Sequence, residues 1–163
     1  MAEKNKCERR IIEMRAVEND ENKMLIEGYA ITFEQPATHD YGGRKFTETI
    51  KRGALDKTDM KDVPMRYNHN DNVMIMARTR NKSLRLTVDR KGLKVEAELI
   101  DTQSNRDIYK AIQEGLIDKM SFAFTVADKG DKWSFGDRET AREVTDIAKL
   151  WDVSVVDTPF YDS

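Results

Sequence analysis

Ser121 lies in a segment whose residue types and spacing suit a nucleophile. The run Met120-Ser121-Phe122-Ala123-Phe124-Thr125-Val126 alternates large apolar residues with small ones. A period of two is typical of a β-strand with one face in a core. The large residues are predicted to face that core, which leaves Ser121 on the opposite face among small side chains. A serine hydroxyl placed there can meet a substrate backbone.

A histidine and a carboxylate occupy similar positions elsewhere in the chain. His69 follows the extended run 63–67, and Asp152 lies with Ser154 on the polar face of a second predicted strand, 151–157. Serine, imidazole and carboxylate are the groups of acyl transfer, in which the imidazole takes the hydroxyl proton and the acid stabilises the imidazolium. Simpler alternatives remain open for each: a cross-strand hydrogen bond, a loop histidine bonded to local backbone, and a surface ion pair.

Six segments, taken in their order along the chain, are similar to a known family. They are IEGYAITF (26–33), GALD (53–56), YNHN (67–70), GLKVEA (92–97), MSFAF (120–124) and DVSVVDTPFY (152–161). Together they resemble the tailed-bacteriophage prohead proteases, the capsid maturation serine proteases related in fold to the herpesvirus assemblins. The ordered set is more specific than any single motif.

The resemblance implies roles for individual residues. Ser121 matches the family's nucleophile, His69 matches its histidine, and Asp152 falls where many relatives have glutamate. Aspartate in that place shortens the reach of the acid by one methylene. Asn70 stands where aspartate is frequent and Ala123 where glycine is common. No cofactor and no metal is implied.

The oxyanion hole is a further expectation from the resemblance. The related viral enzymes use a loop that precedes the strand of the third catalytic residue. Arg142 and the backbone of residues 141–143 are therefore the candidates in this chain.

The implied function is a serine endopeptidase of phage procapsid maturation that cleaves the capsid scaffolding protein, or a scaffold segment, and itself. The expected partners are the major capsid protein and the scaffolding protein, with a homodimer as a further possibility. The expected place is the host bacterial cytoplasm, inside the assembling procapsid, and a longer, self-trimmed precursor is compatible with this activity. The alternative is a catalytically inactive β-barrel that binds scaffold or capsid.

Length and composition exclude or disfavour several other classes of protein. The chain has 163 residues, a length that predicts one domain (11–161) after a polar N-terminal segment (1–10). The charged fraction is 36%, but the formal net charge is only −2, and this near balance argues against a nucleic-acid partner. The single cysteine, Cys7, excludes a disulfide scaffold. No apolar run is long enough for a membrane span. His39 and His69 are separated by a long loop without metal-ligand spacing, which disfavours a metal-dependent hydrolase.

Patterning predicts the elements around these residues. Strands are expected at 9–17 and 24–33, and a hairpin at 83–88 and 93–100. A helix is expected to begin at Ser104 and to carry Ile108, Ile112 and Leu116 on one stripe, so that it leads into the Ser121 strand. Residues 34–45 are predicted as a loop, with a short helix around 49–55.

Residues 129–142 hold Trp133 and Phe135 among charges. This segment is predicted either as a hairpin tip that packs back on the domain or as a contact for substrate or partner. Six or seven short strands indicate a mainly β fold with peripheral helices, closed or nearly closed into a barrel. The resemblance implies the same assemblin-like barrel, with the catalytic groups on the outside of its wall.

Overall fold

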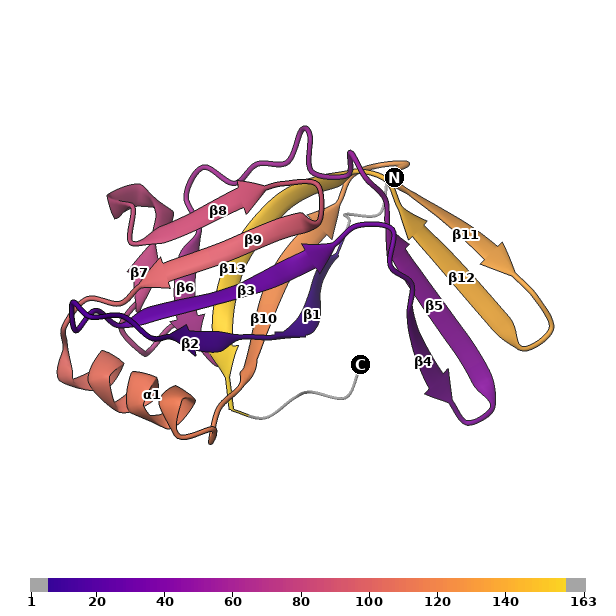
Figure 1. Cartoon of the computed structure of the whole chain (residues 1–163). Helices are drawn as coiled ribbons and strands as arrows, with labels where there is room; N and C mark the ends of the chain where they lie inside the picture. Colours follow the sequence, from indigo (N-terminus) through magenta and orange to yellow (C-terminus); the bar gives the residue numbers. More distant parts are fainter. Residues whose placement is uncertain (1–5, 158–163) are drawn as a thin grey trace.

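Residues 6–157, which the computed structural model describes, form three β-sheets, one α-helix and a short 3₁₀ helix (Figure 1). The last part of the 152–161 motif, residues 158–161, lies outside the described range. The sheets are named A, B and C below.

Sheet A carries the residues predicted to do chemistry. Its strands lie in the order β1 (Cys7–Glu13), β10 (Lys119–Val126), β13 (Ile147–Val156), β6 (Pro64–Tyr67) and β7 (Ala77–Arg78). The β13–β6 pair is parallel and the other pairs are antiparallel. The predicted polar segment 1–10 therefore ends inside a strand, since residues 7–10 pair with β10.

Sheet B contains the predicted hairpin. Its order is β2 (Arg15–Val17), β3 (Leu25–Thr32), β9 (Gly92–Glu98) and β8 (Leu84–Val88), and the 3₁₀ helix, Thr79–Asn81, precedes β8. The hairpin β8–β9 and the strand expected at 24–33 are confirmed. The strand expected at 9–17 is instead divided, because the chain turns from sheet A to sheet B at Met14, whose N–H donates to the Asp118 carbonyl at 3.0 Å.

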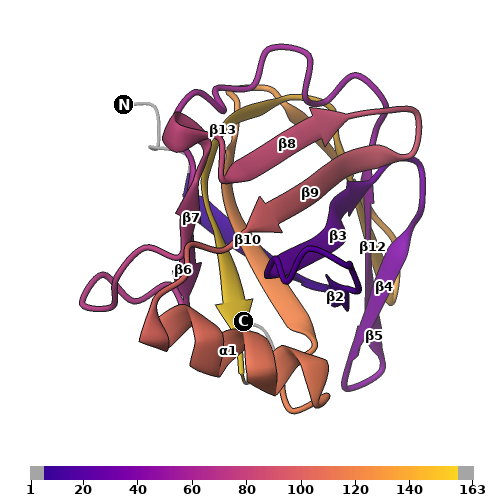
Figure 2. The same ribbon diagram turned by 60° about the vertical axis from the view of Figure 1, so that its left-hand side comes forward.

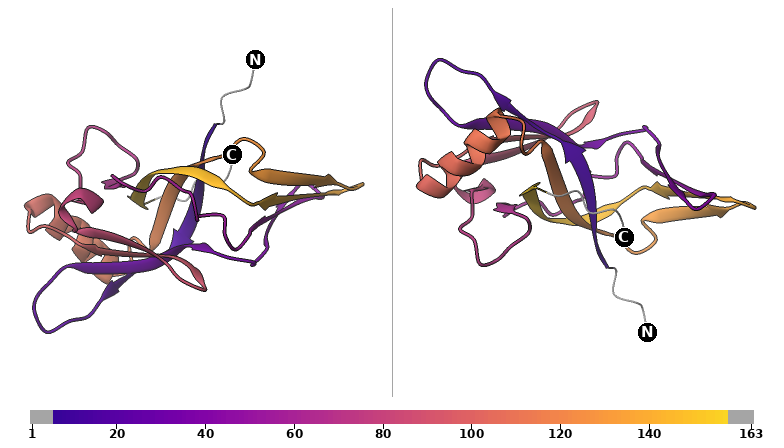
Figure 3. Two further views of the ribbon diagram at one scale, coloured as in Figure 1. Left: turned by 90° about the horizontal axis from the view of Figure 1, so that it is seen from above. Right: turned by 90° about the horizontal axis from the view of Figure 1, so that it is seen from below.

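Sheet C differs from the prediction for residues 34–55. Its order is β11 (Asp131–Phe135), β12 (Glu139–Val144), β5 (Arg44–Ile50) and β4 (Ala37–Tyr41). The predicted loop at 34–45 and helix at 49–55 are therefore wrong over β4 and β5. Gly42 and Gly43 have φ of 63° and 89°, and positive φ at two central residues is what a tight hairpin turn requires. Sheet C projects from the body on the side away from the helix (Figures 1 and 3).

The helix α1, Gln103–Gln113, begins slightly earlier than predicted. Thr102, not Ser104, is its N-cap and accepts a hydrogen bond from the Asn105 N–H at 3.1 Å. Ile112 is buried as expected, but Leu116 is 78% exposed because Gly115, at φ 77°, follows the end of the helix. Figure 2 shows α1 across one end of the body, where the chain leaves it to enter β10.

One hydrophobic core is shared by the sheets and the helix. Sheet A contributes Phe122 and Phe124, sheet B contributes Ile26 and Leu93, and α1 contributes Ile112. Sheet C contributes Ile50 and Val144, at the ends of β5 and β12, to the same core. Within residues 6–157 no sheet closes on itself. The mainly β fold is thus confirmed with a single α-helix, whereas the closed barrel is not.

Candidate active site

Three neighbouring strands of sheet A bring the predicted residues together. Ser121 on β10 pairs with Ser154 on β13, and Asp152 on β13 pairs with Ala123. Directly paired residues of antiparallel strands share one face of the sheet. His69 lies two residues beyond β6, the strand on the other side of β13. Ser121, Asp152 and His69 therefore come from adjacent positions of one sheet.

The three side chains form a continuous chain of contacts. His69 Nε2 lies 2.9 Å from Ser121 Oγ, and His69 Nδ1 lies 2.7 Å from Asp152 Oδ1. Both distances are within hydrogen-bond range. With its proton on Nδ1, the imidazole donates to the carboxylate and presents Nε2 as an acceptor for the serine hydroxyl. That arrangement can activate a serine for nucleophilic attack.

The backbone around His69 is held in an unusual conformation. Asn68 and His69 both have positive φ, 53° and 52°, a left-handed region that residues with side chains seldom adopt. The turn is fastened to β13, since the Asn68 N–H donates to the Val155 carbonyl at 2.8 Å and the His69 N–H donates to Ser154 Oγ at 3.1 Å. These backbone hydrogen bonds hold His69 in the position in which its imidazole contacts Ser121.

Burial of the site is greater than the sequence predicted. Ser121 is only 2% exposed, although it was expected to face an open surface. The His69 turn lies against that face, and the side chain of His69 is itself 2% exposed while that of Asp152 is 16% exposed. Charges and dipoles interact more strongly where water is excluded, so a carboxylate at this position can stabilise a protonated imidazole.

Arg142, a predicted oxyanion-hole residue, lies elsewhere. Its guanidinium bonds Asp131, Glu48 and Glu8, and Glu8 pairs with Phe124 on the core side of sheet A. Ser121 points to the opposite side, because it is an odd number of residues from Phe124 along β10. Arg142 therefore belongs to the junction between sheets A and C, and the oxyanion-hole prediction is wrong for this side chain.

The edge strand β1 contributes to the electrostatics beside the site. Arg9 pairs with Ala123, which in turn pairs with Asp152. Cys7 is an exposed residue, but partial burial of its thiol raises the thiol pKa; Arg9 opposes this shift, and the Asp152 carboxylate adds to it. Cys7 and Arg9 thus share the electrostatic surroundings of the carboxylate.

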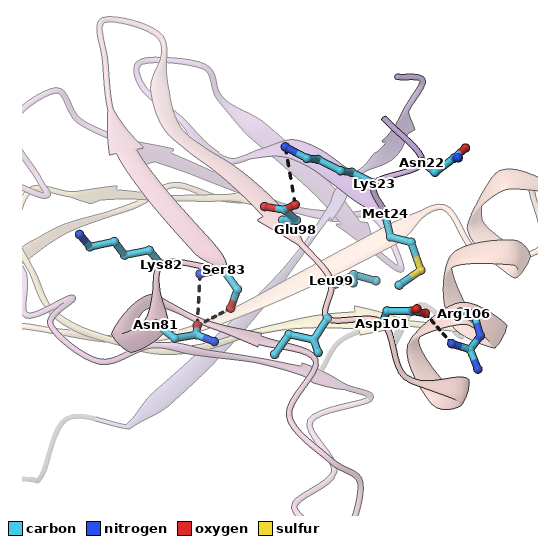
Figure 4. Close-up of a pocket in the computed structure, with 11 residues that line it drawn as sticks. Asn22, Lys23, Met24, Asn81, Lys82, Ser83, Glu98, Leu99, Asp101 and Arg106 are labelled. Carbon is cyan, nitrogen blue, oxygen red and sulfur yellow. Dashed lines mark hydrogen bonds and ion pairs between the residues drawn. The ribbon is translucent and has the colours of Figure 1, made fainter. Parts of the chain in front are cut away.

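A cavity of about 530 Å³ lies away from these residues (Figure 4). It is lined from the turn before β3, the segment before β8 and the start of α1, and its polar side chains pair among themselves, as in Lys23–Glu98 and Asp101–Arg106. None of the three predicted catalytic residues lines it. The cavity is not part of the candidate site.

Metal ligands are not clustered in the described part of the chain: residues 6–157 contain no group of three or more His, Cys, Asp or Glu side chains that could hold an ion. His39 lies on β4 of sheet C, whereas His69 follows β6 of sheet A. Over the same residues, no helix has the length and apolar character needed to cross a membrane.

Serine hydrolases use a serine, an imidazole and a carboxylate in contact, and the three candidate residues have this arrangement. The fold is similar to a solved structure described as the bacteriophage T4 capsid assembly protease, gp21. The TM-score is 0.53 at 12% sequence identity, and the match covers 95% of this chain and 100% of the other. At that identity the likeness shows the fold alone.

The sequence itself assigns the family. The model of the caudovirus prohead serine protease family matches residues 10–163, so this chain belongs to that family and is a protease of the prohead type. No curated protein matches the sequence. The family inferred from the six ordered motifs is thereby confirmed.

Sequence reasoning missed one polar contact of this site. Ser154 was placed on the polar face of its strand, but its approach to His69 was not foreseen. No local pattern predicts that contact, because it depends on where His69, 85 residues earlier in the chain, packs against β13.

Proposed function

We propose that this chain is a serine endopeptidase with Ser121 as nucleophile, His69 as general base and Asp152 as the acid that holds the imidazole. The observation that supports this assignment most is the unbroken contact chain from Ser121 Oγ through both ring nitrogens of His69 to Asp152 Oδ1, at 2.9 and 2.7 Å. Each residue also lies in a motif that resembles the family's, with aspartate at position 152 where many relatives have glutamate.

In the proposed reaction, Ser121 Oγ attacks a peptide carbonyl while its proton passes to His69 Nε2. The imidazolium is stabilised by the Asp152 carboxylate and then protonates the leaving amine. A water molecule repeats the sequence in the second half, so that the acyl-enzyme is hydrolysed and the serine hydroxyl is restored.

The proposed substrates are the capsid scaffolding protein, or the scaffold segment of the capsid subunit, and the protease itself. Membership in the prohead protease family and a fold shared with a capsid assembly protease support this assignment. The proposed partners are the major capsid protein and the scaffolding protein, inside the procapsid in the host bacterial cytoplasm. Weak self-association into a homodimer is part of the same proposal.

Co-expression with the major capsid and scaffolding proteins of the same genome tests this function by intact mass. The unaltered chain is expected to give defined fragments, and both Ser121→Ala and His69→Ala are expected to give none while remaining folded. Ser134→Ala, on exposed β11, is the matched serine control and is expected to cleave normally.

Cleavage that persists in Ser121→Ala would refute the assignment of the nucleophile. Absence of cleavage by the unaltered chain, together with its co-purification with scaffold or capsid protein, would favour the inactive binding module instead.

A further inference from the structure

Ser154 is a fully buried serine that contacts the imidazole of His69. It is 0% exposed and lies on β13, directly opposite Ser121 in the pairing of β13 with β10. Its Oγ accepts a hydrogen bond from the His69 backbone N–H at 3.1 Å and lies 3.1 Å from His69 Nδ1. One hydroxyl therefore touches both the backbone and the ring of the same residue.

The hydroxyl oxygen has the right capacity for both contacts. A serine oxygen carries two lone pairs, one for the backbone N–H and one for a proton on Nδ1. That proton then lies between Asp152 Oδ1, at 2.7 Å, and Ser154 Oγ, at 3.1 Å from the nitrogen. A proton held on Nδ1 leaves Nε2 free to accept the proton of Ser121.

The backbone contact matters because the turn is strained. Asn68 and His69 are consecutive non-glycine residues with left-handed φ, and such residues keep this conformation only when their surroundings impose it. Ser154 supplies the hydrogen bond to the second of them from a strand in the middle of sheet A. The orientation of the His69 imidazole is therefore fixed by its attachment to β13, a strand in the interior of the sheet.

We propose that Ser154 is a positioning residue of the active site, which fixes the orientation and tautomer of His69 through its contacts with the backbone N–H and with Nδ1. This proposal rests on the proposed function, because it assigns Ser154 a role through the base that serves Ser121. A merely structural hydroxyl would affect only stability. A positioning role requires that the tautomer or orientation of the His69 imidazole change when the Ser154 hydroxyl is removed.

Covalent labelling of Ser121 by diisopropyl fluorophosphate measures the nucleophile without a known cleavage site. Ser121 Oγ bonds to phosphorus, the P–F bond breaks, fluoride leaves, and the hydroxyl proton passes to His69. For Ser154→Ala we expect the maximal rate of labelling to fall about 10-fold to 100-fold, with the half-saturating concentration of reagent nearly unchanged, because misplacement of a catalytic group affects the chemical step. Ser154→Thr, which keeps the hydroxyl, is expected to recover most of the rate.

Thr58→Val is the matched control. The Thr58 hydroxyl donates to the Ile147 carbonyl at the start of β13 at 2.6 Å, so this variant also loses one hydroxyl hydrogen bond to the same strand. It makes no contact with His69 and is expected to label at the unaltered rate. If circular dichroism shows that Ser154→Thr does not fold, the labelling rates of Ser154→Ala and Thr58→Val are compared instead, and only a larger loss in Ser154→Ala supports the proposal.

The ¹⁵N spectrum of the imidazole is the second readout. The chain has two histidines, so His39→Gln leaves His69 as the single labelled ring. In this background the ring is expected to carry its proton on Nδ1, and Ser154→Ala is expected to shift the ring toward a mixture of tautomers. An unchanged labelling rate, a loss equal to that of Thr58→Val, or an unchanged imidazole spectrum would overturn the proposal.

Failure of the proposed function has a different signature. If the unaltered chain is not labelled at Ser121, the protease assignment fails, whereas the imidazole spectrum still reports whether Ser154 controls the tautomer of His69.

Discussion

Asp152 reaches the imidazole of His69 although it is one methylene shorter than the glutamate that the family resemblance led us to expect at this position. Its Oδ1 lies 2.7 Å from Nδ1, so the shorter side chain already makes a full hydrogen bond. The contact is possible because the His69 turn is fastened to β13, the strand that carries Asp152. The substitution is thus accommodated by the position of the histidine.

Replacing Asp152 by asparagine is expected to lower kcat by about 10³-fold to 10⁴-fold, because the amide cannot stabilise an imidazolium and favours the wrong tautomer. Asp152→Glu is also expected to lower activity, since an added methylene has no room at 2.7 Å without moving the ring. Asp71→Asn, at an 89% exposed aspartate, is the matched control. Rates of scaffold cleavage measure all three.

Full activity in Asp152→Asn would exclude this carboxylate from the catalytic machinery. Higher activity in Asp152→Glu would contradict this expectation. It would show that glutamate supports the His69 imidazole better than aspartate does and that the imidazole can move to make room for the longer side chain.

At the scale of elements, sheet C is joined to sheet A by a partly buried cluster of charges, of which Arg142 and Glu48 are buried. Arg142 on β12 contacts Glu8 of β1, Glu48 of β5 and Asp131 of β11. Arg10 of β1 also bonds Glu48, at 2.6 Å. Removal of one partner leaves the buried Arg142 or Glu48 imperfectly paired, which is destabilising. The cluster therefore fixes the projecting sheet to the body.

Glu8 makes the stability of this junction depend on pH. Burial by itself would raise the pKa of Glu8, but hydrogen bonds and charge from Arg142 and Arg10 outweigh it and hold the pKa below its ordinary value of 4.5. A lowered pKa in the folded state contributes stability above the ordinary pKa, and this contribution is lost as pH falls through the folded value.

Glu8→Gln is accordingly expected to lower the free energy of unfolding at neutral pH by about 1–3 kcal/mol. The variant should also show a smaller loss of stability on acidification below pH 4.5 than the unaltered chain does. Urea titrations at several pH values measure both effects. Glu13→Gln, at an 88% exposed glutamate on the same strand, is the control, and equal behaviour of the two variants would contradict a role for the junction.

The helix α1 is the element that delivers the chain to the Ser121 strand. Ile112→Ala is expected to lower stability by about 2–5 kcal/mol, because it opens a cavity in the core, and to slow labelling of Ser121 under conditions where the variant is folded. Leu116→Ala, at a residue 78% exposed beyond the helix, is expected to change neither property. An unchanged labelling rate in folded Ile112→Ala would make the helix a connector without influence on the nucleophile.

At the scale of the whole molecule, three sheets depend on one core. Sheet C inserts Ile50 and Val144 into the same hydrophobic cluster that holds Phe122 and Leu93. Further out, its aromatic side chains pack on one another: Trp133 lies 5.7 Å from Phe46 and 6.1 Å from Phe135, between ring centres. The predicted packing of this segment back on the domain is therefore limited to the inner ends of its strands, and Phe135 stays 79% exposed.

Unfolding is expected to be a single cooperative transition despite the projecting shape. The chain has two tryptophans, Trp133 in sheet C and Trp151 in sheet A. Trp151→Phe leaves a reporter on sheet C, and Trp133→Phe leaves one on sheet A. In each variant, urea transitions followed by fluorescence and by far-ultraviolet circular dichroism should coincide. A lower midpoint for Trp133 fluorescence than for circular dichroism would show that sheet C unfolds separately.

Much of the fold is predictable where the pattern is local. Leu84, Leu86 and Val88 pair with Ala97, Val95 and Leu93 in turn, and they form the expected hairpin. Where the prediction failed, a local hairpin signal was missed at Gly42 and Gly43, which connect β4 to β5. β5 also pairs with β12, from a part of the chain 94 residues away. Glu48 faces Arg142 across that pair, and no local pattern of residues 44–50 announces it.

The family and the strand character of the segments around Ser121 and Asp152 follow from the sequence, because motif order and side-chain alternation are properties of the chain read along its length. Which side chains meet at the site depends on the tertiary structure. The contact of His69 with Ser121 spans 52 residues, and its contacts with Asp152 and Ser154 span 83 and 85. Such contacts depend on the pairing of β10, β13 and β6 and on a left-handed turn held by β13, which no neighbouring residues specify.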